Sequence, residues 1–569
     1  MKKSLFPFFV ITLLCATTAY AQRGPEWLKS AVIYHIYPSS FQDSNGDGIG
    51  DLEGIRSRLD YVKACGFNTI WLSPVFESPF EDGGYDITDY YKVDPRFGTN
   101  TQLVELIRDA HAKGIRICLD LVAGHTSDKH PWFRQSCSAD TNLQYSNYYI
   151  WSHSKSSFPT KKFVKSDAPR NGNFLKNYFE IQPALNYGYA HPDPDEPWQQ
   201  GYDDPGPRAV RQEIKNIMAF WMDKGVDGFR CDMAMSLVKN DDRNHTATIR
   251  LWHEMREWLD VHYPECILIS EWSQPSEAIP AGFHVDLIIH NGAGSDMYSP
   301  LICNTNDKNQ PTVCYFDRAG KGQIRSFVDR YTKEWHATRE QGYLSMPTCS
   351  HDIWRLNRNQ RNTPEELKVT MTFFLLMPWV PTVYYGEEIG MRNIEDAPIK
   401  EGSFARRNRS SCRTPMQWDA TPNAGFSTAD AANIFLPIDP DPTRPTVAAQ
   451  TDDPHSLLSY TRGLLALRAA TPALGTLGDW RYVSDPNHPY PMVYAREYAG
   501  EKYIVVLNPS GQRATAQFPE EGAVAEIVYD SGAPARYTVR KGLASVKAEP
   551  LSATVLLSLI HISEPTRLL

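Results

Sequence analysis

The sequence lacks the closely spaced cysteine and histidine pairs that hold a structural zinc ion. It has ten cysteines in 569 residues, but no CxxC pair and no His/Cys cluster, so no zinc site is expected. Basic runs are also absent and the formal net charge is -9, which disfavours nucleic acid and anionic membranes as partners. Neither internal repeats nor low-complexity segments occur. A neutral small-molecule ligand suits this chain better.

Long apolar runs are missing too. The N-terminal run, Leu5 to Cys15, follows the basic start MKK and precedes Ala19-Tyr20-Ala21, an order typical of a secretory signal peptide. The run is short for a bilayer span, which disfavours a membrane anchor. We therefore expect residues 1–21 to be a signal peptide, with cleavage before Gln22. The mature protein would be secreted, periplasmic or extracellular in a bacterium, and free of the membrane.

The cysteines that follow the expected cleavage site are odd in number, so at least one is unpaired. Cys303 and Cys314 flank a loop and form the near pair that suggests a disulfide. The cysteines that lie in expected strands are interpreted as buried thiols. These are Cys118, Cys231, Cys266 and Cys349.

Short apolar or β-branched runs alternate with helical patterns along most of the chain. The expected strands are Val32–Tyr37, Thr69–Ser73, Arg116–Val122, Gly228–Asp232, Ile267–Glu271, Leu287–His290, Leu344–Thr348 and Val380–Tyr385. Helices are expected at Gly54–Ala64, Thr101–Lys113, Arg208–Lys224 and Thr363–Leu376. This alternation predicts an α/β fold, a (β/α)8 TIM barrel.

The barrel is expected in two parts, residues 22–124 and 208–474. Residues 125–207 are rich in Pro, Asn, Tyr and Trp and are far longer than a βα loop, which predicts an inserted domain after the third strand. Alternating strands in residues 475–556 predict a C-terminal antiparallel β-sandwich. Residues 557–569, which begin LSLIHISEPTR, resemble a translated sequencing adapter and are excluded as a non-native tail.

Three acidic residues each close a strand-like run: Asp232 in GVDGFRCD, Glu271 in CILISEW and Asp352 in YLSMPTCSHD. The carboxyl ends of barrel strands meet at one face, so these carboxylates can converge. Cleavage of a glycosidic bond needs a protonated carboxyl beside an ionised one. Any single acid could simply cap its strand or pair with a base. The conjunction of three favours a sugar-cleaving site.

The local context of each acid suggests a role. Glu271 follows an apolar run that suits a raised pKa, so it is assigned as general acid/base. Arg230 shares a strand face with Asp232 and would keep that carboxylate ionised, which suits a nucleophile. Asp352 follows His351, a pair suited to gripping two sugar hydroxyls, and would stabilise the transition state.

The ordered motifs DLVAGH (Asp120 to His125), GFRCD, ISEW and SHD resemble the four signature regions of glycoside hydrolase family 13, the α-amylase and α-glucosidase family. The stretches QPALN, PTVYYGEEIGM and RTPMQWD resemble the branch with oligo-1,6-glucosidases, α-glucosidases, sucrose isomerases and trehalose synthases. The similarity runs from about Val32 to the C-terminal strands. It implies a secreted retaining α-glucosidase that releases glucose from the non-reducing end of short α-linked oligosaccharides through a glycosyl-enzyme.

The resemblance also implies which residues bind the sugar. Three would hold it at the cleavage subsite, two would close the pocket around the non-reducing end, and one lies near the neighbouring subsite. In that order these are Arg230, His125 and His351, then Asp82 and Tyr85, then Arg413. Tyr85 would stack on the sugar ring.

The chain departs from the family pattern beside these residues. Gly124, Ser350 and Gly83 each stand where the family usually has Asn, and Ala184 replaces an Asp. Met233, directly after the nucleophile, stands where relatives preferring α-1,6 bonds tend to carry Val. These departures leave linkage and substrate open. A transglucosylase or isomerase of the same fold, an endo-acting α-amylase and a non-catalytic glycan-binding protein remain alternatives, and the oligomeric state is open.

The segment DSNGDGIGD resembles the first part of a calcium loop. Its oxygen ligands would be the side chains of Asp43, Asn45, Asp47 and Asp51 with the Ile49 carbonyl. The closing Glu of an EF-hand is missing from the twelfth position, so a helix-flanked EF-hand is not expected. A metal-free Asx-turn loop would use the same residues. A calcium ion here would be structural.

Overall fold

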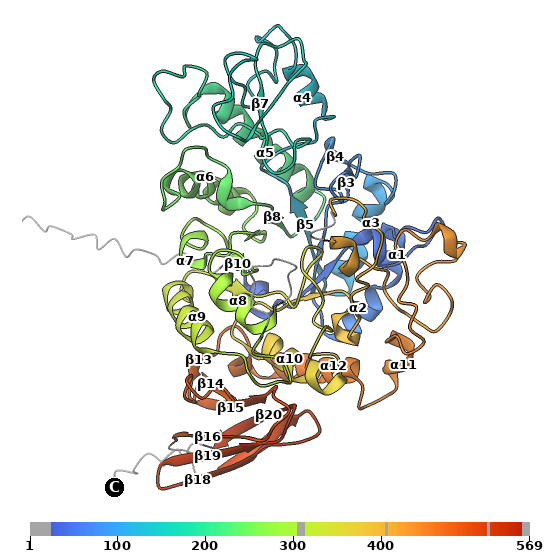
Figure 1. Cartoon of the computed structure of the whole chain (residues 1–569), viewed down its shortest axis with the longest axis vertical. Coiled ribbons are helices and arrows are strands. Elements are labelled where there is room, and N and C mark those ends of the chain that lie inside the picture. The colour runs from blue at the N-terminus through green and yellow to red at the C-terminus, as the bar shows by residue number, and fades with distance from the viewer. Residues whose placement is uncertain (1–23, 304–312, 404–407, 521–523, 560–569) are drawn as a thin grey trace, which may run out of the picture.

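The computed structural model describes residues 24–303, 313–403, 408–520 and 524–559. Figure 1 shows a barrel in the middle of the molecule, a segment that projects from one end of it, and a C-terminal pair of sheets at the other end. The expected signal peptide, residues 1–21, lies outside the described residues. In the part of the chain that is described, no helix has the length and apolarity to cross a membrane.

Eight parallel strands form the barrel, in the order β11-β10-β9-β8-β5-β2-β1-β12. They are β1 (Ile33–Ile36), β2 (Thr69–Leu72), β5 (Arg116–Leu121), β8 (Gly228–Cys231), β9 (Ile267–Ser270), β10 (Val285–Leu287), β11 (Tyr343–Ser345) and β12 (Thr382–Tyr384). A parallel bridge between Pro347 and Thr382 joins the two ends of this order. Almost every strand residue is buried, because helices cover the sheet outside and side chains fill it inside. The predicted TIM barrel is confirmed.

The sixth barrel strand lies two residues earlier than predicted. β10 contains the polar Asp286, and His284 precedes it, so a search for apolar runs misses its start. Both polar side chains are buried and hydrogen-bonded: Leu268 N–H donates to His284 Nδ1 at 3.0 Å. The strand ends at Leu287 because the N–H of Ile289 donates to Ser273 Oγ, at 3.0 Å, and not to a neighbouring strand.

The long helices lie around the barrel: α3 (Asn100–Ala112), α5 (Pro205–Met222), α6 (Thr246–His262), α9 (Arg325–Thr338), α10 (Pro364–Leu376) and α12 (Leu457–Ala470). The stretch predicted as one helix near residue 54 is two, α1 (Leu52–Ser57) and α2 (Leu59–Cys65). Shorter helices are α4 (Pro131–Ser136), α7 (Pro275–Ala278), α8 (Gly294–Ile302) and α11 (Val447–Thr451). Helix α10 begins at a capping box of Thr363 and Glu366.

The chain between β5 and α5 makes the projecting segment. It contains α4 and the paired strands β6 (Phe163–Val164) and β7 (Phe174–Leu175), with a small apolar cluster that includes Ile150 and Tyr189. Nearby, β3 (Phe76–Glu77) pairs with β4 (Asp89–Val93). Tyr187 donates to the carbonyl of Ala123 at 2.6 Å, which ties the projecting segment to the end of β5.

The C-terminal strands form two antiparallel sheets, as predicted. One is β13 (Asp479–Tyr482), β14 (Met492–Tyr498), β15 (Glu501–Asn508), β20 (Ser552–Leu559) and β17 (Val524–Asp530), and the other is β16 (Ala514–Pro519), β19 (Leu543–Ala548) and β18 (Arg536–Arg540). Apolar side chains from both sheets share one core, Phe518 and Val546 facing Ile504. Residues 557–559 of the expected non-native tail extend β20, and residues 560–569 lie outside the described residues.

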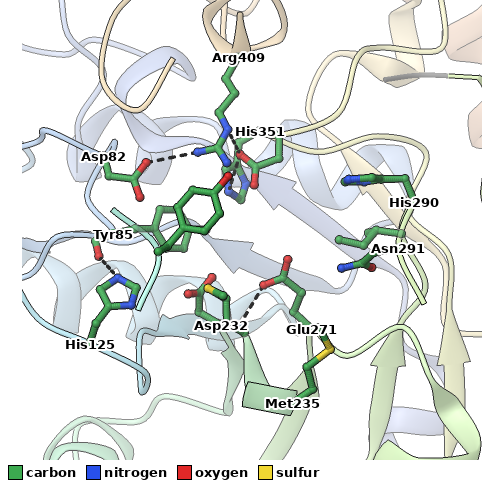
Figure 2. A pocket seen from close by; sticks show the side chains of 14 residues that line it. Asp82, Tyr85, His125, Asp232, Met235, Glu271, His290, Asn291, His351 and Arg409 are labelled. Carbon is green, nitrogen blue, oxygen red and sulfur yellow. Dashed lines mark hydrogen bonds and ion pairs between the residues drawn. The ribbon is translucent and has the colours of Figure 1, made fainter. Parts of the chain in front are cut away.

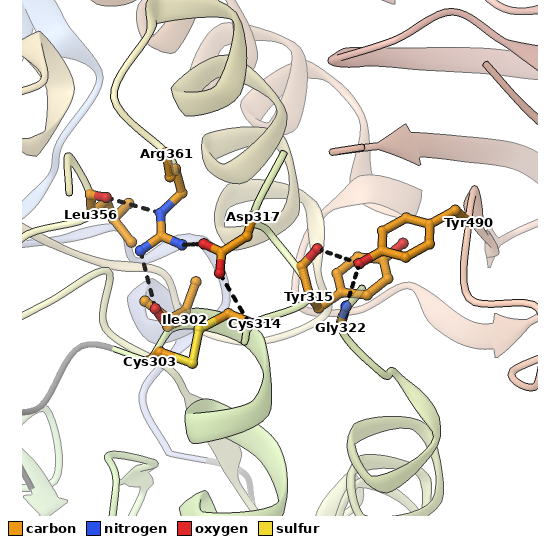
Figure 3. Close-up of a disulfide and its surroundings, with 9 residues drawn as sticks. All are labelled: Ile302, Cys303, Cys314, Tyr315, Asp317, Gly322, Leu356, Arg361 and Tyr490. Carbon is orange, nitrogen blue, oxygen red and sulfur yellow. Dashed lines mark hydrogen bonds and ion pairs between the residues drawn. A yellow bond between two sulfur atoms is a disulfide. The ribbon is translucent and has the colours of Figure 1, made fainter. Parts of the chain in front are cut away.

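Cys303 and Cys314 form a disulfide, the pairing that the sequence suggested (Figure 3). Next to it, Asp317 accepts from the N–H of Cys314 at 3.1 Å and pairs with a barrel arginine. Tyr315 stacks on Tyr490 of the C-terminal domain, with ring centroids 4.8 Å apart. The residue that follows the disulfide, Tyr315, thus contacts the C-terminal domain. Of the cysteines expected as buried thiols, Cys266 is only half-buried.

We predict that opening this disulfide lowers the melting temperature. Closing a loop of 11 residues restricts the unfolded chain, a stabilisation of about 2 to 3 kcal/mol. Thermal melts of the oxidised and the reduced protein measure the difference. The variant Cys303→Ser/Cys314→Ser is the matched control, because reductant should leave its melting curve unchanged. Equal melting temperatures for oxidised and reduced wild type would contradict the prediction.

Candidate active site

A cavity of about 160 Å³ opens where the barrel strands end (Figure 2). Its volume corresponds to roughly ten water-sized sites. The residues that line it are Asp82, Tyr85, His125, Tyr178, Asp232, Met233, Met235, Glu271, Ile289, His290, Asn291, His351, Asp352 and Arg409. The three predicted catalytic acids therefore converge, with four of the six predicted substrate residues. Arg230 and Arg413 lie behind this lining and contact its carboxylates.

One buried guanidinium joins two of the acids. Arg230 Nη1 lies 2.9 Å from Asp232 Oδ1, and Arg230 Nη2 lies 2.7 Å from Glu271 Oε2. Nη1 also lies 2.9 Å from Asp120 Oδ1, inside the barrel. Because β8 and β9 are adjacent and parallel, with Arg230 opposite Ile269, the acids that follow them emerge side by side.

Burial sets the protonation of this pair. It raises the pKa of Glu271 to about 7, against the opposing effect of Arg230, and the nearby Asp232 raises it further. It also raises the pKa of Asp232 to about 6, although Arg230 lowers it. Arg230 lowers the pKa of Asp232 and so favours the ionised carboxylate, the direction expected from the sequence, but burial has the larger effect and leaves the pKa above its ordinary value. At a pH between these two pKa values, most of the Asp232 is ionised and most of the Glu271 is protonated. Glycosidic cleavage needs these two states.

A second buried acid holds the loop that carries Glu271. Asp286 on β10 accepts from Ser270 Oγ at 2.6 Å and from the N–H groups of Trp272 at 3.2 Å and Gln274 at 2.8 Å. These bonds fix the backbone on both sides of Glu271. Sequence reasoning missed Asp286, although an acid inside the apolar run HVDLII was a signal that it has partners.

An arginine closes one end of the cavity. Arg409 lies between two acids, with Nη1 3.2 Å from Asp82 Oδ1 and Nε 3.1 Å from Asp352 Oδ1. Arg413 Nη2 lies 3.2 Å from the same Asp352 oxygen. Gln182 donates to the other Asp82 oxygen at 2.7 Å. Sequence analysis assigned Arg413 and missed Arg409, whose signal was its place just before RTPMQWD.

Aromatic and histidine rings form one wall. The Tyr85 hydroxyl donates to Asp120 at 2.8 Å, and its ring lies 5.1 Å from that of His351 at an interplanar angle of 17°. His125 Nε2 donates to the Tyr85 carbonyl at 2.9 Å, while Nδ1 accepts from Asn177 at 2.9 Å. Burial lowers the pKa of His125 to about 4, so the ring is neutral. Both ring nitrogens of this predicted sugar ligand are bonded within the protein.

The opposite side of the cavity contains residues that the sequence did not indicate. His290 and Asn291, from the loop after β10, lie beyond Glu271 as seen from Asp82 (Figure 2). Met235 lies below them, and Tyr178 lies at the mouth with 40% of its surface exposed.

The loop expected to bind calcium is closed by its own hydrogen bonds. Asp43 accepts from the N–H groups of Asn45 at 3.0 Å and Gly48 at 2.8 Å, and Asp47 accepts from Ile49 at 2.8 Å. Within the described ranges, no group of three or more His, Cys, Asp or Glu residues is placed to hold a metal ion. The carboxylate, amide and carbonyl oxygens match the ligand preference of calcium. A calcium site here stays a prediction.

Comparison with known proteins agrees with this geometry. The profile of the alpha amylase catalytic domain matches residues 35–476. The trehalose synthase/amylase TreS of Mycolicibacterium smegmatis is 32% identical over 510 residues, which cover 83% of this chain and 81% of that protein. An oligo-1,6-glucosidase of Heyndrickxia coagulans is 30% identical over 548 residues, 87% and 94% of the two chains. The crystal structure of the trehalulose synthase MutB from Pseudomonas mesoacidophila MX-45 superposes with a TM-score of 0.77 at 26% identity, over 94% and 100% of the chains. The resemblance found in the sequence is confirmed, and the chain belongs to the alpha-amylase family, glycoside hydrolase family 13.

Proposed function

We propose that the protein is a retaining α-glucosidase that removes glucose from the non-reducing end of short α-linked oligosaccharides. The observation that carries the proposal is the Arg230 guanidinium, which holds Asp232 and Glu271 at one small cavity. Two carboxyls that share one guanidinium are close, whereas an inverting mechanism needs room for a water between acids about 6.5 to 9.5 Å apart.

The assigned roles give a double displacement. Glu271 donates its proton to the leaving glycosidic oxygen while Asp232 attacks the anomeric carbon, which forms a covalent glycosyl-enzyme. Glu271, now ionised, takes a proton from water, and the water oxygen displaces Asp232 from the anomeric carbon. Asp352, held by Arg409 and Arg413, would bind two hydroxyls of the sugar and favour its distorted ring.

The closed end of the cavity supports attack at a chain end. Arg409 joins Asp82 and Asp352 across that end, so a glucan cannot continue past the bound sugar there. The opposite side, with His290 and Asn291, is where a leaving group would lie. This arrangement disfavours an endo-acting α-amylase, which needs a cleft open at both ends.

A transglucosylase or isomerase is the second proposal, because relatives named trehalose synthase and trehalulose synthase are similar over most of the chain. Both activities use the same glycosyl-enzyme and differ in whether water or a sugar displaces Asp232. We also propose export of the mature protein, with residues 1–21 as its signal peptide. No nucleic acid partner is expected.

Product analysis tests these proposals. The protein is incubated with maltose, isomaltose, sucrose, trehalose, maltooligosaccharides and starch, and products are separated by chromatography. Release of glucose from short substrates supports the α-glucosidase, whereas new disaccharides without free glucose support the isomerase. Rapid conversion of starch to mixed oligosaccharides, with disaccharides untouched, would overturn both.

We predict a bell-shaped pH dependence of kcat/KM with limbs near 6 and near 7. Asp232 must be ionised, so activity falls as the pH drops below about 6. Glu271 must be protonated, so activity falls as the pH rises above about 7. The two acids interact, so both limbs belong to the pair.

Two variants test the roles of the two acids. Asp232→Asn should lose most turnover on every substrate, because no nucleophile remains. Glu271→Gln should still release an aryl leaving group that needs no protonation, but its glycosylation step should lose the alkaline limb. An alkaline limb retained in Glu271→Gln, or wild-type rates in Asp232→Asn, would refute the assignment.

Met233 should influence linkage preference. It lines the cavity, its backbone N–H donates to Glu271 Oε2 at 3.0 Å, and its φ of 45° turns it away from the strand. An apolar group that shapes a sugar pocket discriminates by about 1 to 3 kcal/mol, so Met233→Ala should shift the maltose to isomaltose ratio of kcat/KM by roughly tenfold or more towards maltose. An unchanged ratio with a normal melting temperature would place linkage choice elsewhere.

Calcium, if bound at the loop, should raise the melting temperature. A ligand that binds only the folded state at 100 times its Kd stabilises it by about 2.7 kcal/mol. Melts with and without chelator measure this, and activity below the transition should persist. Asp47→Asn is the matched control, since its exposed carboxylate is an expected ligand and the variant should be insensitive to chelator. Identical wild-type curves would count against the site.

A further inference from the structure

A polar side chain from the projecting segment fills the space beside Gly124. A Cβ at position 124 would lie 2.6 Å from Asn177 Nδ2 and 3.5 Å from Leu237 Cδ2. The first distance is shorter than any ordinary contact of a Cβ. A side chain at position 124 would therefore displace the Asn177 amide from its present position. Gly124 is one of the positions at which this chain departs from its family.

The Asn177 amide contacts two residues of the cavity. Its Nδ2 donates to His125 Nδ1 at 2.9 Å and lies 3.7 Å from Met233 Sδ. His125 Nε2 donates to the Tyr85 carbonyl, so Nδ1 has to be the acceptor. The Tyr85 carbonyl and the Asn177 amide thus set the tautomer of His125 together, and the amide holds the Nδ1 side of the ring in place. In metal sites of other proteins, a hydrogen bond to the second ring nitrogen of a histidine orients the ring in the same way.

Asn177 also begins a turn that is attached to the cavity at a second point. Its backbone N–H donates to the Gln182 carbonyl at 2.9 Å, and the Gln182 side chain accepts from Phe179 N–H at 2.9 Å. The same Gln182 side chain donates to Asp82 at 2.7 Å. Tyr178 therefore lies between two fixed points, His125 on one side and Asp82 on the other.

We propose that Asn177 is a positioning residue of the active site. It aligns His125 and, through this turn, holds Tyr178 at the mouth of the cavity, and it occupies the space that a side chain at position 124 would take. The proposal rests on the proposed function, because His125 and Tyr178 line the cavity in which the sugar would bind.

Removing the amide should weaken the binding of the sugar more than it slows the chemistry. Asn177→Ala leaves Asp232, Glu271 and Arg230 untouched, so the loss of kcat/KM for maltose should appear mainly as a higher KM. One hydrogen bond of ordinary strength corresponds to a loss of about five- to tenfold. Glu180→Ala is the matched control, because Glu180 lies in the same turn, is exposed and pairs only loosely with Lys176, at 3.3 Å.

Substitutions at positions 124 and 177, alone and combined, distinguish a positioning role of Asn177 from a general contribution to stability. Gly124→Asn alone should lower both the melting temperature and kcat/KM, because its Cβ meets the Asn177 amide. In the double variant Gly124→Asn/Asn177→Ala the same substitution should restore the melting temperature and lower KM relative to Asn177→Ala. Only a residue that takes over the space and the polar role can produce this reversal of sign.

Two outcomes would overturn the proposal. The first is a wild-type KM in Asn177→Ala. The second is that Gly124→Asn lowers the melting temperature and kcat/KM equally in the wild-type and the Asn177→Ala backgrounds. A wild-type protein inactive on all α-glucosides would instead refute the proposed function. In that case the melting temperatures of the four proteins still decide whether the two positions exchange.

Discussion

The buried guanidinium of Arg230 is the constraint on which the rest of the site depends. It contacts Asp120, Asp232 and Glu271 while almost fully buried, an arrangement that is costly unless every charge is paired. Asp120 in turn accepts from Trp71 and Tyr85, which extends the same network to the aromatic wall. Removing Arg230 would leave the carboxylates of Asp120 and Asp232 buried without their cation. The strands β5, β8 and β9 therefore have to keep their register, because a shift of one strand would break the ion pairs that Arg230 makes.

The parts of this site that the sequence could predict are those attached to strand ends. Asp232 and Glu271 come directly after the strands β8 and β9. Because these strands are adjacent and parallel, the residues that follow them lie side by side at the same end of the barrel. The parts that it could not predict come from segments whose path is irregular. Arg409 lies in a long connection after β12, and Asn177 lies in the projecting segment. No periodic pattern links such positions to the cavity, although Arg409 lines it and Asn177 contacts two residues that line it.

Asp286 shows a different reason for failure. Its strand was displaced in the prediction because polar residues inside a sheet contradict the rule that apolar runs mark buried strands. In this protein the polar residue has a structural role, because four donors in the loop around Glu271 bind the Asp286 carboxylate. Buried acids with several backbone donors are therefore better interpreted as organisers of a neighbouring loop than as breaks in a strand.

Two glycines beside the cavity, Gly83 and Gly124, share a physical effect. Gly83, at φ 61°, leaves room for Arg413, whose Nη1 would lie 2.8 Å from a Cβ there, and Gly124 leaves room for Asn177 in the same way. In both places a missing side chain lets a neighbouring polar group reach a residue of the cavity: Arg413 donates to the carbonyl of His351, and Asn177 to His125. These two contacts shape the wall of the cavity beside the carboxylates. The order of the three acids along the sequence is enough to indicate the type of reaction. The choice of substrate depends on contacts such as these, which form only when the chain folds.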